Sequence, residues 1–180
     1  MHFIIPASII LTKVKRRKNH KRLFCAATRR PCLAVLRRGV CIDIRNRSRK
    51  AVPPDGTIRR VVGRVLAAEG VGNAHLSIQF VDDGFIKKLN RLFKGASRPT
   101  DVLSFDLSGQ GTGDFVFADV VVSVQTAHRT AARLDIDPVQ EILRYVIHGL
   151  LHLLGYDDLT PRTRRKMWRR QEELVRGLSS

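Results

Sequence analysis

The chain has 180 residues, enough for one domain with a substantial buried core. Hydrophobic residues make up 43% of it and charged residues 27%, a composition typical of a globular protein, and no apolar run reaches the roughly 18 residues that a membrane-spanning helix needs. The formal net charge of +17 indicates a negatively charged partner such as nucleic acid.

The positive charge is concentrated at the N-terminus. Residues 1–39 hold 11 Lys and Arg and no Asp or Glu, which leaves +6 for residues 40–180. We therefore interpret 1–39 as a basic, disordered extension or a mis-assigned start, with a transit peptide as the alternative, and 40–180 as a single domain. The three cysteines, Cys25, Cys32 and Cys41, are an odd number, lie early in the chain and form no CxxC pair. We therefore interpret the chain as reduced and cytoplasmic.

Apolar periodicity predicts the elements of the first half of the domain. In chain order these are a strand over 40–46, a helix over 57–70, a strand over 75–81, and a helix that Asp82 caps and whose buried face runs from Phe85 to Phe93. A basic loop, 94–100, follows this helix and carries Lys94 and Arg98.

The second half is predicted in the same way. Its elements are strands over 101–107 and 115–123, a helix over about 124–134, a helix from Val139 to Leu154 that Asp137 and Pro138 start, and a last helix over 162–176. The order β-α-β-α-β-β-α-α-α predicts an α+β fold, a small mixed sheet with helices packed against it.

The segment 148-HGLLHLLGYDD-158 is typical of a metal site. His148 and His152 are four residues apart on a helix, so both imidazole rings can reach one ion. Gly155 permits a sharp reversal of the chain, which would return Asp158 toward the two histidines. The spacing favours Asp158 over Asp157 as the third ligand.

Gly149 stands where a zinc protease of the HExxH type places its catalytic glutamate. Glycine cannot accept a proton from metal-bound water, so this pattern argues against peptide hydrolysis by that route. A phosphodiester requires less of an external base, since a metal ion can bind the phosphate and stabilise the developing charge.

The sequence resembles the YbeY-type endoribonucleases, a family of ribosomal RNA maturation factors. The matching segments are 42-IDIRNRS-48, 89-LNRLFKGASRPTDVLSFDL-107, 113-GDFVFADVVVS-123, 148-HGLLHLLGYDD-158 and 167-MWRRQEEL-174. The resemblance implies a four-stranded mixed sheet with about five helices and a metal site at the end of a central helix. It also implies one Zn²⁺ per chain, single-strand-specific RNA cleavage in ribosomal RNA 3′-end processing, and quality control of the small ribosomal subunit in the cytoplasm.

Two positions depart from the family pattern. The family usually has a third histidine where this chain has Asp158, which keeps the ligand count but makes the site less electrophilic. The family usually has Tyr-Arg where this chain has Phe93-Lys94, and lysine lacks the bidentate fork of arginine. We expect His148, His152 and Asp158 to hold the metal, His148 and Lys94 to serve in catalysis, and Lys94 with Arg98 to bind substrate phosphate.

Several interpretations stay open at the level of the sequence. A non-catalytic ribosome-assembly factor with a structural zinc ion is the main alternative, and a zinc peptidase is the third. The basic final helix is either a solvated surface or a phosphate-binding one, and the low aromatic content of 6% favours backbone electrostatics over base stacking. His75 and His128 are interpreted as surface or core residues and Asp114 as a turn cap. The oligomeric state is left open.

Overall fold

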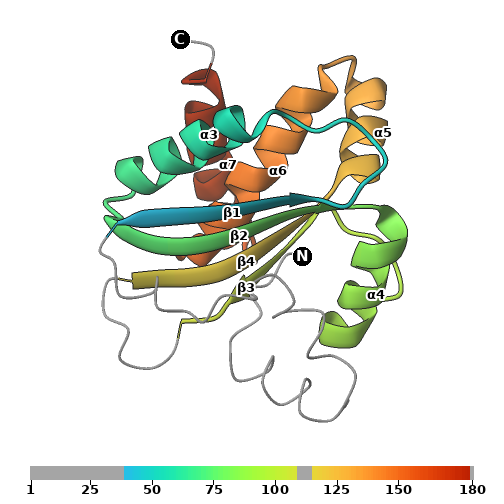
Figure 1. Cartoon of the computed structure of the whole chain (residues 1–180), viewed down its shortest axis with the longest axis horizontal. Coiled ribbons are helices and arrows are strands. Elements are labelled where there is room, and N and C mark those ends of the chain that lie inside the picture. The colour runs from blue at the N-terminus through green and yellow to red at the C-terminus, as the bar shows by residue number, and fades with distance from the viewer. Residues whose placement is uncertain (1–38, 109–114, 179–180) are drawn as a thin grey trace.

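The centre of the protein is a four-stranded mixed sheet, seen in a computed structural model that describes residues 39–108 and 115–178 (Figure 1). The strands lie in the order β1-β2-β4-β3. They are β1 (Val40–Asn46), β2 (Asn73–Val81), β3 (Val102–Asp106) and β4 (Phe115–Ser123). β1, β2 and β4 are parallel, and β3 runs antiparallel to β4 at one edge.

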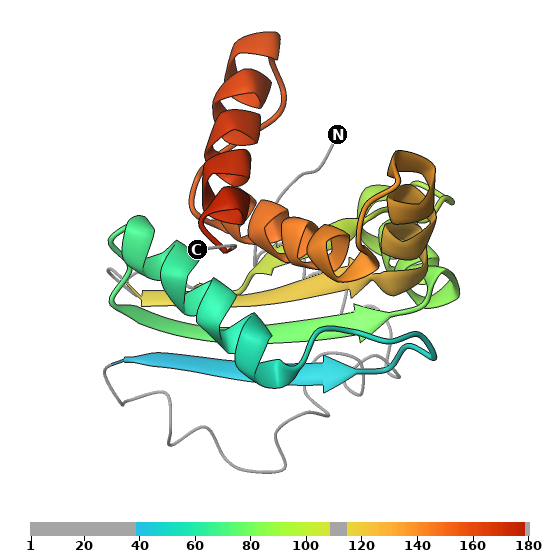
Figure 2. The ribbon, with the colours of Figure 1, turned by 90° about the horizontal axis from the view of Figure 1, so that it is seen from above.

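Helices cover both faces of the sheet. Those described are α3 (Asp55–Ala68), α4 (Asp83–Lys94), α5 (Val124–Leu134), α6 (Pro138–Leu153) and α7 (Pro161–Arg176). α3, α5, α6 and α7 lie on one side and α4 on the other (Figure 1). Seen from above, α6 lies over the sheet and α7 extends away from it at a steep angle to the strands (Figure 2). The predicted α+β fold and the order of its elements are confirmed.

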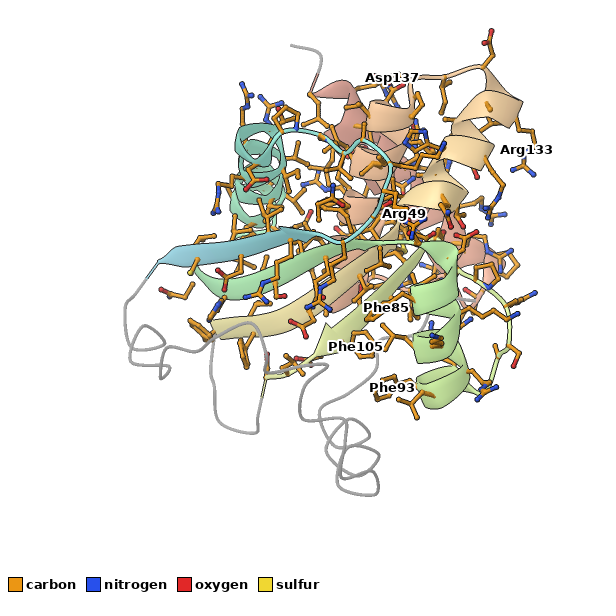
Figure 3. The ribbon with its side chains drawn as sticks, turned by 45° about the vertical axis from the view of Figure 1, so that its right-hand side comes forward. Arg49, Phe85, Phe93, Phe105, Arg133 and Asp137 are labelled. Atoms are coloured by element: carbon orange, nitrogen blue, oxygen red, sulfur yellow. The ribbon has the colours of Figure 1, made fainter. Side chains whose placement is uncertain are left out.

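Strand alternation produces two hydrophobic cores. On β2, Leu76, Ile78 and Phe80 are fully buried against α3 and α6, because alternate side chains of a strand point to the same face. On the opposite face, α4 packs its apolar side onto β3 and β4. There the rings of Phe93 and Phe105 meet edge to face, with centroids 5.1 Å apart (Figure 3).

Side chains cap the N-terminal ends of three helices. The Asp137 carboxylate accepts a hydrogen bond from the Val139 N–H, 2.9 Å away, at the start of α6. Thr160 and Thr163 form a reciprocal capping box at the start of α7. Ser123 caps α5. The prediction that Asp82 caps α4 is wrong in one respect: Asp82 occupies the N-cap position, but its carboxylate accepts instead from the Ser48 hydroxyl.

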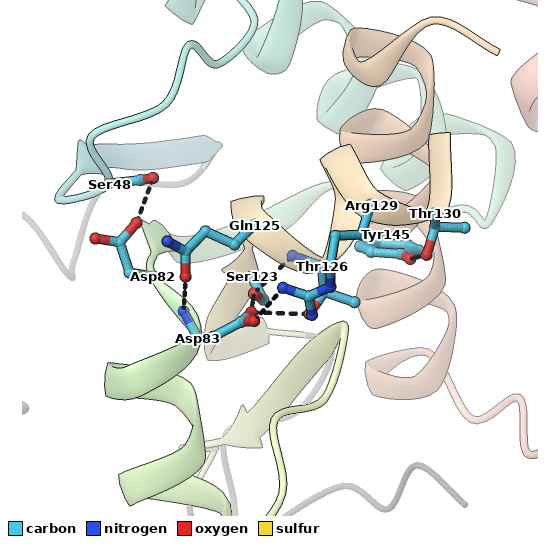
Figure 4. A network of polar contacts seen from close by, with 9 residues as sticks. All are labelled: Ser48, Asp82, Asp83, Ser123, Gln125, Thr126, Arg129, Thr130 and Tyr145. Carbon is cyan, nitrogen blue, oxygen red and sulfur yellow. Dashed lines mark hydrogen bonds and ion pairs between the residues drawn. The ribbon is translucent and has the colours of Figure 1, made fainter. Parts of the chain in front are cut away.

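The first turn of α4 is tied to α5 by a polar cluster around Asp83 (Figure 4). The Asp83 carboxylate accepts from the hydroxyls of Ser123 and Thr126 and from the guanidinium of Arg129. Burial alone would raise the pKa of Asp83, but these hydrogen bonds outweigh it and hold that pKa below its usual range. The cluster fixes the helix whose last residue is Lys94.

Element boundaries match the predicted ones to within a few residues, and β4 and α5 match at both ends. Residues 1–38 and 109–114 lie outside the described part of the chain, so the interpretation of the N-terminal extension and that of Asp114 stay untested predictions. Among the described helices, none is both long and apolar enough to cross a membrane.

Candidate metal centre

His148 and His152 lie on adjacent turns of α6, near its C-terminal end. Their Nε2 atoms are 3.2 Å apart, and the rings are nearly perpendicular, with centroids 4.7 Å apart. His152 is almost fully buried at 3% exposure, whereas His148 is partly exposed. The helical spacing therefore brings the two rings together, as predicted.

The other nitrogen of each ring is held by a backbone or side-chain oxygen. Nδ1 of His148 lies 2.8 Å from Oε1 of Gln171 on α7. Nδ1 of His152 lies 3.0 Å from the carbonyl oxygen of Tyr156 in the loop that follows α6. Oxygens of both kinds only accept, so both Nδ1 atoms carry the proton and donate it.

A chain of polar contacts fixes the orientation of the Gln171 amide. Its Nε2 donates to Glu172 at 3.2 Å, which directs its oxygen toward His148. Glu172 in turn accepts from Arg144, whose guanidinium also contacts the buried Glu141. The tautomer of His148 is thus set by residues of two helices, and partners of this kind commonly orient the histidines of metal sites.

This arrangement fits a bound cation. With both Nδ1 atoms protonated, the two Nε2 lone pairs of His148 and His152 point toward each other across 3.2 Å. Two facing lone pairs repel each other unless a proton or a metal ion lies between the nitrogens. Two imidazole nitrogens that bind one tetrahedral zinc ion at about 2.0–2.1 Å are separated by about 3.3 Å, so the observed separation suits such an ion.

Asp158 lies in the loop between α6 and α7. Gly155 makes the reversal with a φ of +91°, a conformation that favours glycine. The Oδ1 atom of Asp158 is buried and has no hydrogen-bond partner among the described residues, while Arg164 donates to its backbone carbonyl. A buried carboxylate oxygen without a donor is a candidate metal ligand.

The structure does not bring all three predicted ligands together. In residues 39–108 and 115–178, no three His, Cys, Asp or Glu side chains are gathered closely enough to hold a metal ion. The histidine pair is present, and ligation by Asp158 stays a prediction. Asp157 has another role, since its carboxylate accepts from the Leu159 N–H at 3.0 Å.

Gly149 packs directly against the sheet. A Cβ atom at this position would lie 2.9 Å from the side chains of Val102 and Val120 and 3.0 Å from the Ser104 hydroxyl. That hydroxyl donates to the Gly149 carbonyl at 2.9 Å. The helix approaches the strands too closely for any side chain here, so this packing leaves no room for a glutamate next to His148.

Lys94 is the other predicted site residue that the structure brings close. It is half-buried at the end of α4, and burial lowers the pKa of its ammonium group, while the nearby carboxylates of Asp101 and Asp158 act in the opposite direction. Its charge therefore interacts with the third predicted ligand. Arg98 is exposed, and its backbone carbonyl accepts a hydrogen bond from the Asn90 amide.

The polar support around the histidines was missed at the level of the sequence. Gln171 belongs to the last helix, for which the sequence indicated only a basic surface, and Tyr156 acts through its backbone. Neither contact has a local sequence signal. Of the other histidines in the described part of the chain, His75 lies 3.1 Å from an Asp43 carboxylate oxygen and His128 lies 3.3 Å from the Ala51 carbonyl oxygen.

A sequence model of the family described as Endoribonuclease YbeY matches residues 43–179. The chain belongs to the YbeY family. The Endoribonuclease YbeY of Moorella thermoacetica is 41% identical over 132 residues, covering 68% of this chain and 85% of that protein. That of Pelotomaculum thermopropionicum is 39% identical over 130 residues, covering 69% and 86%.

A solved structure has the same fold. The solution structure of TM1509 from Thermotoga maritima aligns with a TM-score of 0.53 at 26% identity, over 76% of this chain and 88% of that one. The YbeY match includes Lys94, the histidine pair and Asp158. The resemblance that the sequence motifs indicated is therefore confirmed.

Proposed function

We propose that this protein is a zinc-dependent endoribonuclease that cuts single-stranded RNA. Two independent facts support this. The relatives are named as endoribonucleases, and the paired histidines have the geometry of a cation site. We further propose a cytoplasmic role in ribosomal RNA 3′-end maturation and in quality control of the small ribosomal subunit.

The histidine pair carries the proposal. The Nε2 atoms of the two rings lie 3.2 Å apart, a separation that suits two ligands of one zinc ion. In this proposal His148, His152 and Asp158 would hold one zinc ion, with His148 the ring that is partly open to solvent. When bound, such an ion supplies Lewis-acid stabilisation of the charge that develops on a phosphate oxygen.

Other residues of the chain would bind and orient the RNA. The ammonium group of Lys94, close to Asp158, would neutralise charge on the scissile phosphate. The exposed Arg98 would contact a neighbouring phosphate. The Gln171 and Tyr156 oxygens keep both imidazoles in the tautomer that presents Nε2 to the site.

One observation favours a second candidate. His148 and Gln171 join α6 to α7, and His152 joins α6 to the following loop, so a metal here could hold these elements together without catalysis. A non-catalytic assembly factor with a structural zinc ion is therefore the alternative. The third reading, a zinc peptidase, gains no support because of the packing at Gly149.

Metal content and RNA cleavage, measured on the same preparation, test the proposal. We expect about one zinc per chain by elemental analysis and cleavage of single-stranded RNA that a chelator abolishes. His148→Ala should lose both, whereas Leu134→Ala, which changes an exposed side chain at the end of α5, should lose neither. Zinc binding without any cleavage would favour the assembly factor, and a metal-free protein that cuts RNA would exclude the proposed mechanism.

A further inference from the structure

Trp168 is the most exposed large hydrophobic side chain in the described part of the chain, at 63%. It lies midway along α7 and is the only tryptophan of the protein. An indole ring of this exposure contributes little to the core, since the buried residues of α7 are Met167, Gln171, Leu174 and Val175. Tryptophan combines a large apolar ring with an N–H donor and is enriched at interaction surfaces, so an exposed one is a candidate contact residue.

The position of Trp168 on α7 places it next to the histidine site. Residues three or four apart are neighbours on a helix surface, so Trp168 lies between Arg164 and Gln171. Gln171 contacts Nδ1 of His148 at 2.8 Å. Arg164 donates to the carbonyl oxygen of Asp158 at 3.1 Å. Trp168 therefore lies between two residues of α7 that contact the candidate site. Gln171 contacts His148, and Arg164 contacts the backbone of Asp158.

Positive charge lies on the next face of α7, beyond Arg165, which is one helical turn before Trp168. A groove of about 600 Å³ runs along that face, and its lining includes Tyr156, Arg162, Arg165, Lys166, Arg169 and Glu173 but not Trp168. Lys166 lies over the Tyr156 ring, 5.4 Å from its centroid. Within residues 39–108 and 115–178, Arg165 and Arg169 form no ion pair, whereas Arg170 is bound to Glu69 and Glu173.

We propose that Trp168 is a stacking platform for one base of single-stranded RNA, with Arg165 and Arg169 beside it binding backbone phosphates. The surface combines an exposed aromatic ring with cations, which is how proteins bind single strands without sequence readout. A duplex, whose internal bases are already stacked and paired, can present a base face to the indole only at its two ends. The platform would thus help this protein select single strands. The inference rests on the proposed function for the identity of the polymer.

The single tryptophan makes stacking directly measurable. The probe is a short oligouridylate with 2′-O-methyl groups, which resists cleavage. It should quench the tryptophan fluorescence of the zinc-loaded protein, and a duplex of the same length should quench it much less. An abasic oligomer should bind through its phosphates without comparable quenching. Equal quenching by the abasic and the base-containing strand would overturn the proposal.

Substitutions separate the aromatic from the electrostatic part. Binding of a labelled oligouridylate, measured by anisotropy, should weaken by roughly tenfold in Trp168→Ala and much less in Trp168→Phe. Arg165→Ala and Arg169→Ala should each reduce the slope of affinity against salt concentration. Leu134→Ala is the matched control, because it removes another exposed apolar side chain at a distant helix end. Affinity of Trp168→Ala within twofold of the unsubstituted protein would overturn the platform.

Different results would contradict the stacking platform and the proposed nuclease activity. A protein that cuts single-stranded RNA with no change in tryptophan fluorescence would retain the proposed function and lose the platform. A protein whose fluorescence is quenched by single strands, but which never cuts them, would retain the platform and lose the proposed nuclease activity. Circular dichroism of each variant establishes that it is folded before binding is compared.

Discussion

The side-chain oxygen of Gln171 lies 2.8 Å from Nδ1 of His148, so a residue of α7 determines which nitrogen of a histidine on α6 faces the candidate metal centre. The link is stabilised further by Glu172 and Arg144, which hold the Gln171 amide in one orientation. A site that local spacing creates on one helix is therefore completed by the packing of the next.

Replacement of Gln171 should weaken metal binding. Gln171→Ala removes the acceptor that fixes the His148 tautomer, and we expect zinc affinity to fall by about 10- to 100-fold. Competition with a chromophoric chelator measures this loss. Gln171→Glu keeps an acceptor at the same place and should retain most of the affinity. Equal loss in both variants would show that the residue acts through packing alone.

Asp158 should prove to be the third ligand. Asp158→Ala removes the buried, unpartnered carboxylate oxygen, and zinc affinity should fall clearly, whereas Asp158→His should preserve or tighten it. Isothermal titration with zinc compares the three forms. Asp157→Ala is the comparison, since that carboxylate accepts from Leu159 and acts on His152 only through its charge, so affinity should fall much less than in Asp158→Ala. Three equal affinities would remove Asp158 from the ligand set.

Lys94 should act through its positive charge. Lys94→Ala should lower the RNA cleavage rate by at least about tenfold, while Lys94→Arg should retain it. Burial lowers the pKa of Lys94, so the active, cationic form is lost at a lower pH than for an exposed lysine. The rate should therefore fall on the alkaline side in the unsubstituted enzyme, and this fall should be absent in Lys94→Arg. Identical pH profiles would contradict this role.

The close contact at Gly149 should make any side chain there destabilising. Gly149→Ala places a Cβ atom 2.9 Å from two valine side chains, and we expect a loss of about 1–3 kcal/mol of unfolding free energy. Urea denaturation measures it. Gly63→Ala in α3, where a Cβ would meet nothing within 4 Å, should instead be neutral or stabilising by up to about 1 kcal/mol. Equal midpoints for the two variants would refute the packing argument.

Asp119 should make stability depend on pH. Burial raises its pKa to about 6, against an ordinary 3.8, although the Ser77 hydrogen bond and His75 act in the opposite direction. The folded state therefore favours the protonated carboxyl, and its contribution to stability is lost as pH rises from about 4 to about 6. Asp119→Asn should be more stable than the unsubstituted protein at pH near 7, by on the order of 3 kcal/mol. This advantage should shrink as the pH falls from about 6 to about 4.

Urea denaturation at both pH values measures the Asp119 effect. The difference between the two proteins isolates this residue from the other carboxylates. An advantage of the same size at both pH values would contradict the assignment.

The local part of the fold was predictable. Apolar periodicity predicted the type and order of all the described elements, because a strand repeats every two residues and a helix about every 3.6. The start of α6 followed from Asp137 and Pro138. The error at Asp82 has a tertiary cause, since the Ser48 hydroxyl, 34 positions away, engages the carboxylate that would otherwise cap α4.

The sequence by itself determined the pairing of His148 and His152, because residues four apart on a helix share a face whatever surrounds them. Only the tertiary structure decided that both Nε2 atoms face each other, that Gly149 lies against the strands, and that Lys94 lies near Asp158. These relationships join segments distant in the chain. They depend on how the helices pack on the sheet and on each other, which no local spacing encodes.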